Sequence, residues 1–294
     1  MTSQEKKTWN VKDVLFWTSD YFTEKEITSP HLNAELLIAH VLDCSRLDLY
    51  LKYDKPLSEK ELSYIKKLIK SRASHYPIQY LIGKTEFFGL PFFVEEGVLI
   101  PRPETEILVD AVISFIKESN QIEWHLLDIG TGSGNIPIAI VDSFKKSPKK
   151  ISVLATDISE KALEIAKRNS DKNEIDDITL LISDLFENIS SSYDCIISNP
   201  PYIREKEFNE LPKEIKEHEP REALFAGENG FEFYNNILKD AKKYLKVDGL
   251  IFFEIGAYQK EGLMNLAKQY NYKMIDTKKD YNDFDRVVIL KNNA

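Results

Sequence analysis

The chain has 294 residues, of which 43% are hydrophobic and 30% charged, which is ordinary for a globular protein with room for a large domain and a smaller one. No apolar run reaches the length of a membrane span, and the two cysteines have no disulfide or metal-ligand spacing, so we expect a cytoplasmic protein without a metal site or membrane contact. The formal net charge is −9, and it is concentrated after residue 85, where it reaches −11 against +2 for residues 1–85. An acidic main body disfavours stable nucleic-acid binding, which depends on neutralising phosphates.

Residues 1–85 are predicted to form a helical domain. Apolar residues recur at helical spacing in the segments 11–15, 36–42 and 62–69, and prolines separate the segments. The third segment also carries basic side chains: Lys60, Lys66, Lys67, Lys70 and Arg72. We interpret them as a solvated helix face, with a docking surface as the alternative.

Residues 86–100 are predicted to form a β-hairpin linker, because aromatic and β-branched residues flank a turn at Gly89-Leu90-Pro91. In residues 101–294, short apolar strands alternate with amphipathic helices. The predicted strands are 124–129, 151–157, 178–183, 193–198 and 250–255, with 272–276 and 286–290 closing the sheet; the predicted helices are 136–143, 159–170, 231–244 and 260–270. This alternation is typical of a doubly wound, Rossmann-like α/β domain with helices on both sheet faces.

A glycine-rich loop follows the first predicted strand of this domain. Its residues are Gly130, Thr131, Gly132, Ser133 and Gly134. Glycines at alternate positions let a ligand approach the backbone closely, although such a loop alone is also compatible with a phosphate site or a tight turn. The spacing G-x-G-x-G, without a following Gly-Lys-Ser/Thr, disfavours the dinucleotide and P-loop alternatives.

Acidic residues follow the next two strands. Asp157 ends the second strand, where a carboxylate commonly accepts hydrogen bonds from ribose hydroxyls; the alternative is a cap on the next helix. Asp184 follows the third strand and could accept the amino group of an adenine, with Leu185 or Phe186 covering the ring; the alternative is a turn acid. Because the carboxyl ends of parallel strands meet at one edge, these groups and the glycine loop are expected to line one site.

The fourth strand ends in Asn199-Pro200-Pro201-Tyr202. Neither proline can donate to a sheet ladder, so the chain leaves the sheet extended with an amide, uncommitted carbonyls and an aromatic ring close together. Such a cluster could hold a planar, nitrogen-bearing group. A plain strand-to-loop turn is the alternative.

Together these features resemble the S-adenosylmethionine-dependent methyltransferases that modify a planar amino or amide nitrogen. Asn-Pro-Pro-Tyr is shared by adenine-N6 and protein-glutamine methyltransferases, and the remaining motifs distinguish between them. Those motifs are Pro77–Gly83 (PIQYLIG), Glu86-Phe87-Phe88, Val98–Glu106 (VLIPRPETE), His218–Leu224 (HEPREAL) and Phe253-Glu254-Ile255-Gly256. From about residue 10 to the C-terminus, the chain resembles the HemK/PrmC family of peptide-chain release factor glutamine methyltransferases.

The resemblance implies a class I methyltransferase fold with S-adenosylmethionine as cofactor. It implies methylation of the glutamine amide in the Gly-Gly-Gln motif of release factors, acting on translation termination, with the helical domain helping to bind the release factor. The cofactor-binding residues are then expected to be Gly130–Gly134, Asp157, Asp184, Leu185 and Asn199. Leu185 departs from family members that carry an aromatic residue there. We expect a monomer.

The expected catalytic and substrate-binding residues are those of the Asn-Pro-Pro-Tyr stretch. The Asn199 side-chain oxygen and the Pro200 carbonyl are expected to accept the two N–H groups of the substrate amide, and Tyr202 to pack on the amide plane, beside Pro201. The Pro103–Glu106 and His218–Leu224 segments are expected to flank the pocket. Arg102, Glu104 and Glu106 are interpreted as caps and ion pairs, and Glu254 as either a buried pocket acid or a salt-bridge partner.

Two other functions remain open from the sequence. One is an adenine-N6 methyltransferase acting on DNA or RNA, which would need a basic groove or a flipped base. The other is a cofactor-binding protein without catalysis that uses its helical part for protein interaction. The acidic main body disfavours the first alternative, and the intact Asn-Pro-Pro-Tyr stretch disfavours the second.

Overall fold

The computed structural model describes residues 8–293 and divides into two compact units. The helical unit comprises the chain up to Gly83 together with Lys213–His218. The sheet unit comprises Lys84–Pro212 and the chain from Glu219 onward. A short segment from the middle of the sheet unit's sequence therefore groups with the helical unit. None of the helices within residues 8–293 is long and apolar enough to cross a bilayer.

The helical unit contains the three helical segments predicted from periodicity, with three shorter helices. Its helices are α1 (Val11–Glu24), α2 (Pro30–Val41), α3 (Arg46–Leu51), α4 (Glu59–Ala73), α5 (Ile78–Ile82) and α10 (Lys213–His218). Ser45 and Ser58 cap α3 and α4 with capping boxes. Each serine hydroxyl accepts the backbone amide of Asp48 or Glu61, and the carboxylate of that acid accepts the backbone amide of the serine. The apolar faces of α1, α2 and α4 then meet in one core.

The basic residues of α4 divide into two groups. The four lysines are exposed, which agrees with a solvated face. Arg72 is buried at 2% exposure, so its inclusion in that face was wrong. Its guanidinium donates to Asn33 Oδ1 at 2.7 Å, to the Tyr76 carbonyl at 3.1 Å and to Glu214 Oε2 at 2.8 Å. Because Glu214 belongs to α10, a buried charge-assisted contact holds Lys213–His218 within the helical unit.

The sheet unit begins with a hairpin of β1 (Lys84–Phe87) and β2 (Leu90–Phe93). Its two turn residues, Phe88 and Gly89, both have positive φ, at 54° and 74°, as a two-residue type I′ turn requires. The predicted turn was therefore one residue too late, and Val98–Ile100 form no strand. The patterns of apolar and turn residues indicated a hairpin but could not fix its register.

Seven strands form the main sheet, in the order β5-β4-β3-β6-β7-β9-β8. They are β3 (Glu123–Ile129), β4 (Lys150–Asp157), β5 (Ile178–Ile182), β6 (Tyr193–Ser198), β7 (Leu245–Glu254), β8 (Tyr272–Lys279) and β9 (Asp285–Asn292). The first five are parallel, and β9 runs antiparallel to β7 and β8. This confirms the predicted doubly wound sheet. The strand order reverses beside β3, which pairs with β4 on one side and β6 on the other.

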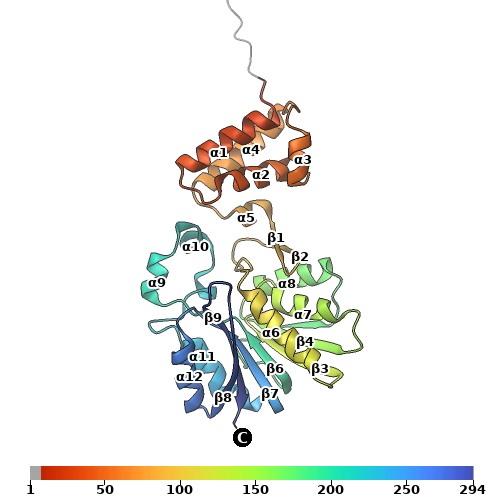
Figure 1. Cartoon of the computed structure of the whole chain (residues 1–294), viewed down its shortest axis with the longest axis vertical. Helices are drawn as coiled ribbons and strands as arrows, with labels where there is room; N and C mark the ends of the chain where they lie inside the picture. The colour runs from red at the N-terminus through yellow and green to blue at the C-terminus, as the bar shows by residue number, and fades with distance from the viewer. Residues whose placement is uncertain (1–7, 294) are drawn as a thin grey trace, which may run out of the picture. The chain divides into compact units, whose positions relative to one another are not determined.

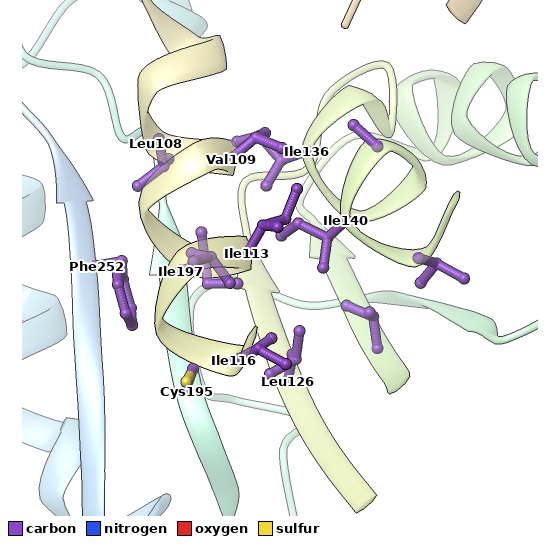
Figure 2. Packing of buried hydrophobic residues seen from close by; sticks show 14 of the residues in the cluster. Leu108, Val109, Ile113, Ile116, Leu126, Ile136, Ile140, Cys195, Ile197 and Phe252 are labelled. Carbon is purple, nitrogen blue, oxygen red and sulfur yellow. The ribbon is translucent and has the colours of Figure 1, made fainter. Parts of the chain in front are cut away.

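Helices cover both faces of this sheet (Figure 1). They are α6 (Thr105–Glu118), α7 (Asn135–Phe144), α8 (Glu160–Lys172), α11 (Glu232–Asp240) and α12 (Lys260–Gln269), with the 3₁₀ turn η2 (Ala241–Lys243) after α11. The short helix α9 (Glu205–Glu210) and the 3₁₀ turn η1 (Arg221–Ala223) belong to the segment between β6 and α11, and α9 lies away from the sheet (Figure 1). Apolar residues of α6 and α7 pack on β3, β6 and β7 to form one core, in which Ile113 and Ile140 meet Leu126 and Ile197 (Figure 2). On the other face, α11 and α12 cover a second core. Alternating residues of each strand thus enter opposite cores.

We predict that Arg72→Gln loosens α10 from the helical unit. The substitution removes the charge that pairs with Glu214, so the amides of residues 213–218 should exchange hydrogen about tenfold faster or more. Lys70→Gln is the matched control, because it removes an equal charge from the exposed face of the same helix. Hydrogen exchange followed by mass spectrometry measures both. Equal exchange of this segment in the two variants would contradict the role of Arg72.

Candidate active site

A cavity of about 780 Å³ lies in the sheet unit at the carboxyl ends of β3, β4 and β6. Ten of the residues predicted from the sequence line it: Gly130, Thr131, Gly132, Ser133, Asp157, Asp184, Leu185, Asn199, Pro200 and Pro201. Two do not, Gly134 and Tyr202. The carboxyl ends of the strands therefore bring together residues as distant in sequence as Gly130 and Pro201.

The glycine loop is shaped to leave room beside its backbone. Gly130 and Gly132 have φ of 75° and 54°, a region that residues with a Cβ rarely adopt. The amides of Gly130 and Thr131 donate to the Thr156 carbonyl, each at 2.9 Å, which fixes the loop on β4. A Cβ built on Gly130 meets nothing within 4 Å. The open space beside this loop suits a ligand that contacts the backbone.

Gly134 has a different role. It begins α7 with φ of 77°, and a Cβ there would lie 3.1 Å from the Cβ of Ala166 on α8. It therefore permits two helices to approach, which is a packing requirement.

Asp157 lines the cavity and is not the cap of α8, since that helix is capped by Ser159, whose hydroxyl accepts the Ala162 amide. Asp157 Oδ1 accepts the Ser159 amide at 2.9 Å, ahead of α8, and its Oδ2 accepts the Gly132 amide at 2.8 Å. Burial raises the pKa of this carboxyl, and hydrogen bonds from backbone amides oppose the shift. The carboxylate thus braces the glycine loop while lining the cavity, and each oxygen keeps a lone pair for a further donor.

Asp128, two residues before the loop, was not selected from the sequence. It is fully buried and does not line the cavity, and neither carboxyl oxygen has a hydrogen-bond donor at bonding distance within residues 8–293. Burial raises its pKa to about 7, and the nearby hydroxyl of Thr131, at the cavity wall, opposes this shift. A buried acid of this kind commonly marks a functional site. An acid two residues before a glycine loop, near a strand end, was the signal available in the sequence.

The loop after β5 contains Leu185 and Phe186, the two residues that the sequence offers to cover an adenine ring, and the structure places them differently. Leu185 lines the cavity with φ of 46°, and its carbonyl accepts the Ser183 hydroxyl at 3.0 Å. Phe186 instead points into the core, where its ring stacks on Tyr244 with centroids 4.6 Å apart. Asp184 is exposed at the cavity edge. The structure therefore leaves Leu185, and not Phe186, beside the cavity.

At the end of β6, Asn199 is half-buried and anchored at one side of its amide. Its Nδ2 donates to Thr105 Oγ1 at 3.2 Å, which leaves its side-chain oxygen uncommitted. Tyr202 turns away from the cavity lining: its carbonyl accepts Gln259 Nε2 at 3.0 Å. Burial raises the pKa of its hydroxyl. The Asn-Pro-Pro segment and the tyrosine thus face different surroundings.

The expected flanking segments contain an ion pair, at Arg102, while Glu104 stands at the cap position of α6 without a side-chain cap hydrogen bond. The buried carboxylate of Glu219 accepts the Ile100 amide at 3.2 Å and also pairs with Arg102. Glu106 Oε1 accepts the Phe88 amide at 2.8 Å, ahead of the hairpin turn. Sequence reasoning missed Thr105 and Glu219 as individual site residues. Their roles depend on contacts across 94 and 117 positions of the chain, which no local pattern displays.

Comparison with known proteins identifies both parts of the chain. Residues 13–83 match the family model of the PrmC N-terminal domain, and residues 105–220 match that of the methyltransferase small domain. A release factor glutamine methyltransferase from Rhodopirellula baltica is 39% identical over 96% of this chain and 96% of its own length. The chain belongs to the release factor glutamine methyltransferase family. A second family member, from Chlorobaculum tepidum, is 36% identical over 96% of this chain and 97% of its own length.

The fold agrees with this family assignment. A methyltransferase structure from Pyrococcus furiosus, 20% identical, superposes with a TM-score of 0.51 over 71% of this chain and 91% of that one. At this identity the likeness concerns the fold alone, a class I methyltransferase sheet with flanking helices. The predicted fold and family are therefore confirmed.

We predict that Gly134→Ala destabilises this methyltransferase more than Gly130→Ala. The two glycines have nearly equal φ, 77° and 75°, but only Gly134 is crowded by a neighbouring helix. Backbone strain should cost each variant about 1–2 kcal/mol in the free energy of unfolding, and overpacking should add about 1–3 kcal/mol at Gly134 alone. Denaturant unfolding measures the difference, and equal losses would show that the contact with Ala166 yields without cost.

Proposed function

We propose that this protein transfers a methyl group from S-adenosylmethionine to the side-chain amide nitrogen of the glutamine in the Gly-Gly-Gln motif of peptide-chain release factors. The observation that carries the proposal is one cavity lined by the glycine loop and Asn199-Pro200-Pro201 together. The reported relatives are named for glutamine methylation of release factors, which supports this acceptor over an adenine base.

One half of the cavity would hold the cofactor. The open backbone at Gly130 and Gly132 accommodates a close approach, and the Thr131 hydroxyl lines the same wall of the cavity. Asp157 would accept the ribose hydroxyls through its remaining lone pairs, and Asp184 the adenine amino group, with Leu185 against the ring. An aliphatic side chain can supply apolar contact to the adenine, so the missing aromatic removes stacking but not burial.

The other half would hold the acceptor. A glutamine amide is a weak nucleophile, because its nitrogen lone pair is delocalised into the carbonyl. The Asn199 side-chain oxygen and the Pro200 carbonyl would accept its two N–H groups, orient the nitrogen and favour the positive charge that develops there. S-adenosylmethionine supplies the methyl on a positively charged sulfur. The nitrogen loses its proton to solvent after transfer, so these residues need not include a base.

One direct experiment identifies the substrate. The full-length protein is incubated with S-adenosylmethionine and a purified release factor, and separately with DNA and RNA, and each product is analysed by mass spectrometry. We expect a gain of one methyl group on the Gly-Gly-Gln peptide, located on the glutamine side chain by fragmentation. Methyladenine in the nucleic acid, or no methylated product in any reaction, would contradict the proposed function.

We further predict that substitutions in the two halves of the cavity separate turnover from cofactor binding. Asn199→Ala should lower kcat about 100- to 1000-fold, because it removes one of two acceptors for the substrate amide. Its cofactor Kd should remain within about threefold of wild type, since the cofactor half of the site is untouched. Asp157→Ala is the counterpart and should weaken cofactor binding about tenfold or more. Calorimetry and steady-state kinetics measure both; cofactor binding lost in proportion to activity in Asn199→Ala would contradict these roles.

A further inference from the structure

Behind Asn199 lies a pair of buried polar side chains from two other elements. Thr105, the first residue of α6, is 2% exposed, and Glu254, the last residue of β7, is 1% exposed. The register of β6 with β7 pairs Ser198 with Phe253, so Asn199 and Glu254 leave the sheet side by side. The Thr105 hydroxyl oxygen accepts Asn199 Nδ2 at 3.2 Å. None of these contacts involves the cofactor loop.

We propose that Thr105 and Glu254 are positioning residues that hold the Asn199 amide with its oxygen turned toward the substrate. This rests on the proposed function, because it concerns the acceptor that Asn199 offers to a glutamine amide. The direction of each hydrogen bond decides which end of the amide faces the substrate.

The two ends of an asparagine amide have nearly the same shape, so only polar neighbours decide which end faces the cavity. Thr105 can accept the Asn199 N–H only while its own proton points elsewhere. The Glu254 carboxyl is the acceptor that we place there, because Glu254 leaves β7 beside Asn199 and its buried Oε2 meets no hydrogen-bond donor at bonding distance within residues 8–293. The nearby Thr105 and Tyr202 hydroxyls lower the pKa of this carboxyl against the effect of burial. A flipped Asn199 would need the Thr105 proton for itself. Glu254 would then lose a donor in a site where water cannot replace it.

The charge of Glu254 therefore decides whether the Thr105 hydroxyl donates toward Glu254 or toward Asn199. Burial raises its pKa to about 7, against the opposing hydrogen bond from Thr105 and the charge of Arg286 on β9. Glu104, ahead of α6, acts in the same direction as burial. A protonated Glu254 can donate to Thr105, which can then donate to the Asn199 oxygen. Below about pH 7 the amide should turn its NH₂ toward the substrate, and kcat should fall as pH falls through the pKa of Glu254.

The test compares Thr105→Val, Thr105→Ser and Glu254→Gln in the full-length protein, with S-adenosylmethionine and a release factor as substrates. Thr105→Val should lower kcat about 10- to 100-fold, with the cofactor Kd within about threefold of wild type. Thr105→Ser keeps the hydroxyl and should retain most of the wild-type kcat. Glu254→Gln cannot ionise, so its kcat should lose the acidic limb near pH 7 that wild type shows. Thr18→Val is the matched control, because Thr18 is equally buried and its hydroxyl has no partner within residues 8–293.

The outcomes are distinct. A wild-type kcat in Thr105→Val, or an equal loss in the valine and serine variants, overturns the positioning role while the wild-type reaction still supports the proposed function. If wild type methylates no glutamine, the proposed function itself fails in the same assay. If Thr105→Val does not fold, as judged by circular dichroism, the pH profile of Glu254→Gln decides: an acidic limb identical to that of wild type overturns the inference.

Discussion

The pairing of β3 with β6 is the constraint on which the site depends. These strands are distant in sequence but adjacent in the sheet, with Ile129 opposite Ser198. The buried Ser198 hydroxyl donates to the Ile129 carbonyl at 2.8 Å, at the last position before both strands end. The next residues, Gly130 and Asn199, therefore diverge from one point, one toward the proposed cofactor half of the cavity and one toward the proposed acceptor half. A slip of one residue would turn the side chains of the slipped strand to the opposite face and separate the two halves.

Two buried acids at this sheet edge show how stability and function oppose each other. Asp128, one residue before the end of β3, and Glu254, the last residue of β7, are both fully buried, and burial raises the pKa of each to about 7. An uncompensated carboxylate in a core lowers stability, so such positions are expected where a ligand or a neighbouring donor compensates. The Thr131 hydroxyl opposes the pKa shift at Asp128, and Thr105, Tyr202 and Arg286 oppose it at Glu254. Neither carboxyl is fully satisfied within residues 8–293, since Glu254 Oε2 and both oxygens of Asp128 lack a donor at hydrogen-bonding distance there.

The sequence predicted the sheet and most of the cavity because both follow from local patterns. Buried strands are continuous apolar runs, and parallel strands bring their carboxyl ends together, so Gly130, Asp157 and Asn199 could be placed at one edge without a structure. It could not choose between Leu185 and Phe186, because the positive φ of Leu185 and the stacking of Phe186 on Tyr244 are set by tertiary packing. The position of Tyr202 outside the cavity lining has the same cause, since Gln259, 57 positions away, binds its carbonyl.

The assignment of α10 to the helical unit means that the segment between β6 and α11 takes part in both units. The segment is closed at its base within the sheet unit, where Ile203 exchanges backbone hydrogen bonds with Leu224 and Ala226. Its central part, Lys213–His218, belongs to the helical unit, where Arg72 binds Glu214. One residue further, Glu219 is again bound inside the sheet unit. The chain that follows the proposed acceptor residues is therefore covalently continuous with the unit that matches the PrmC N-terminal domain, at a point far in sequence from residues 13–83.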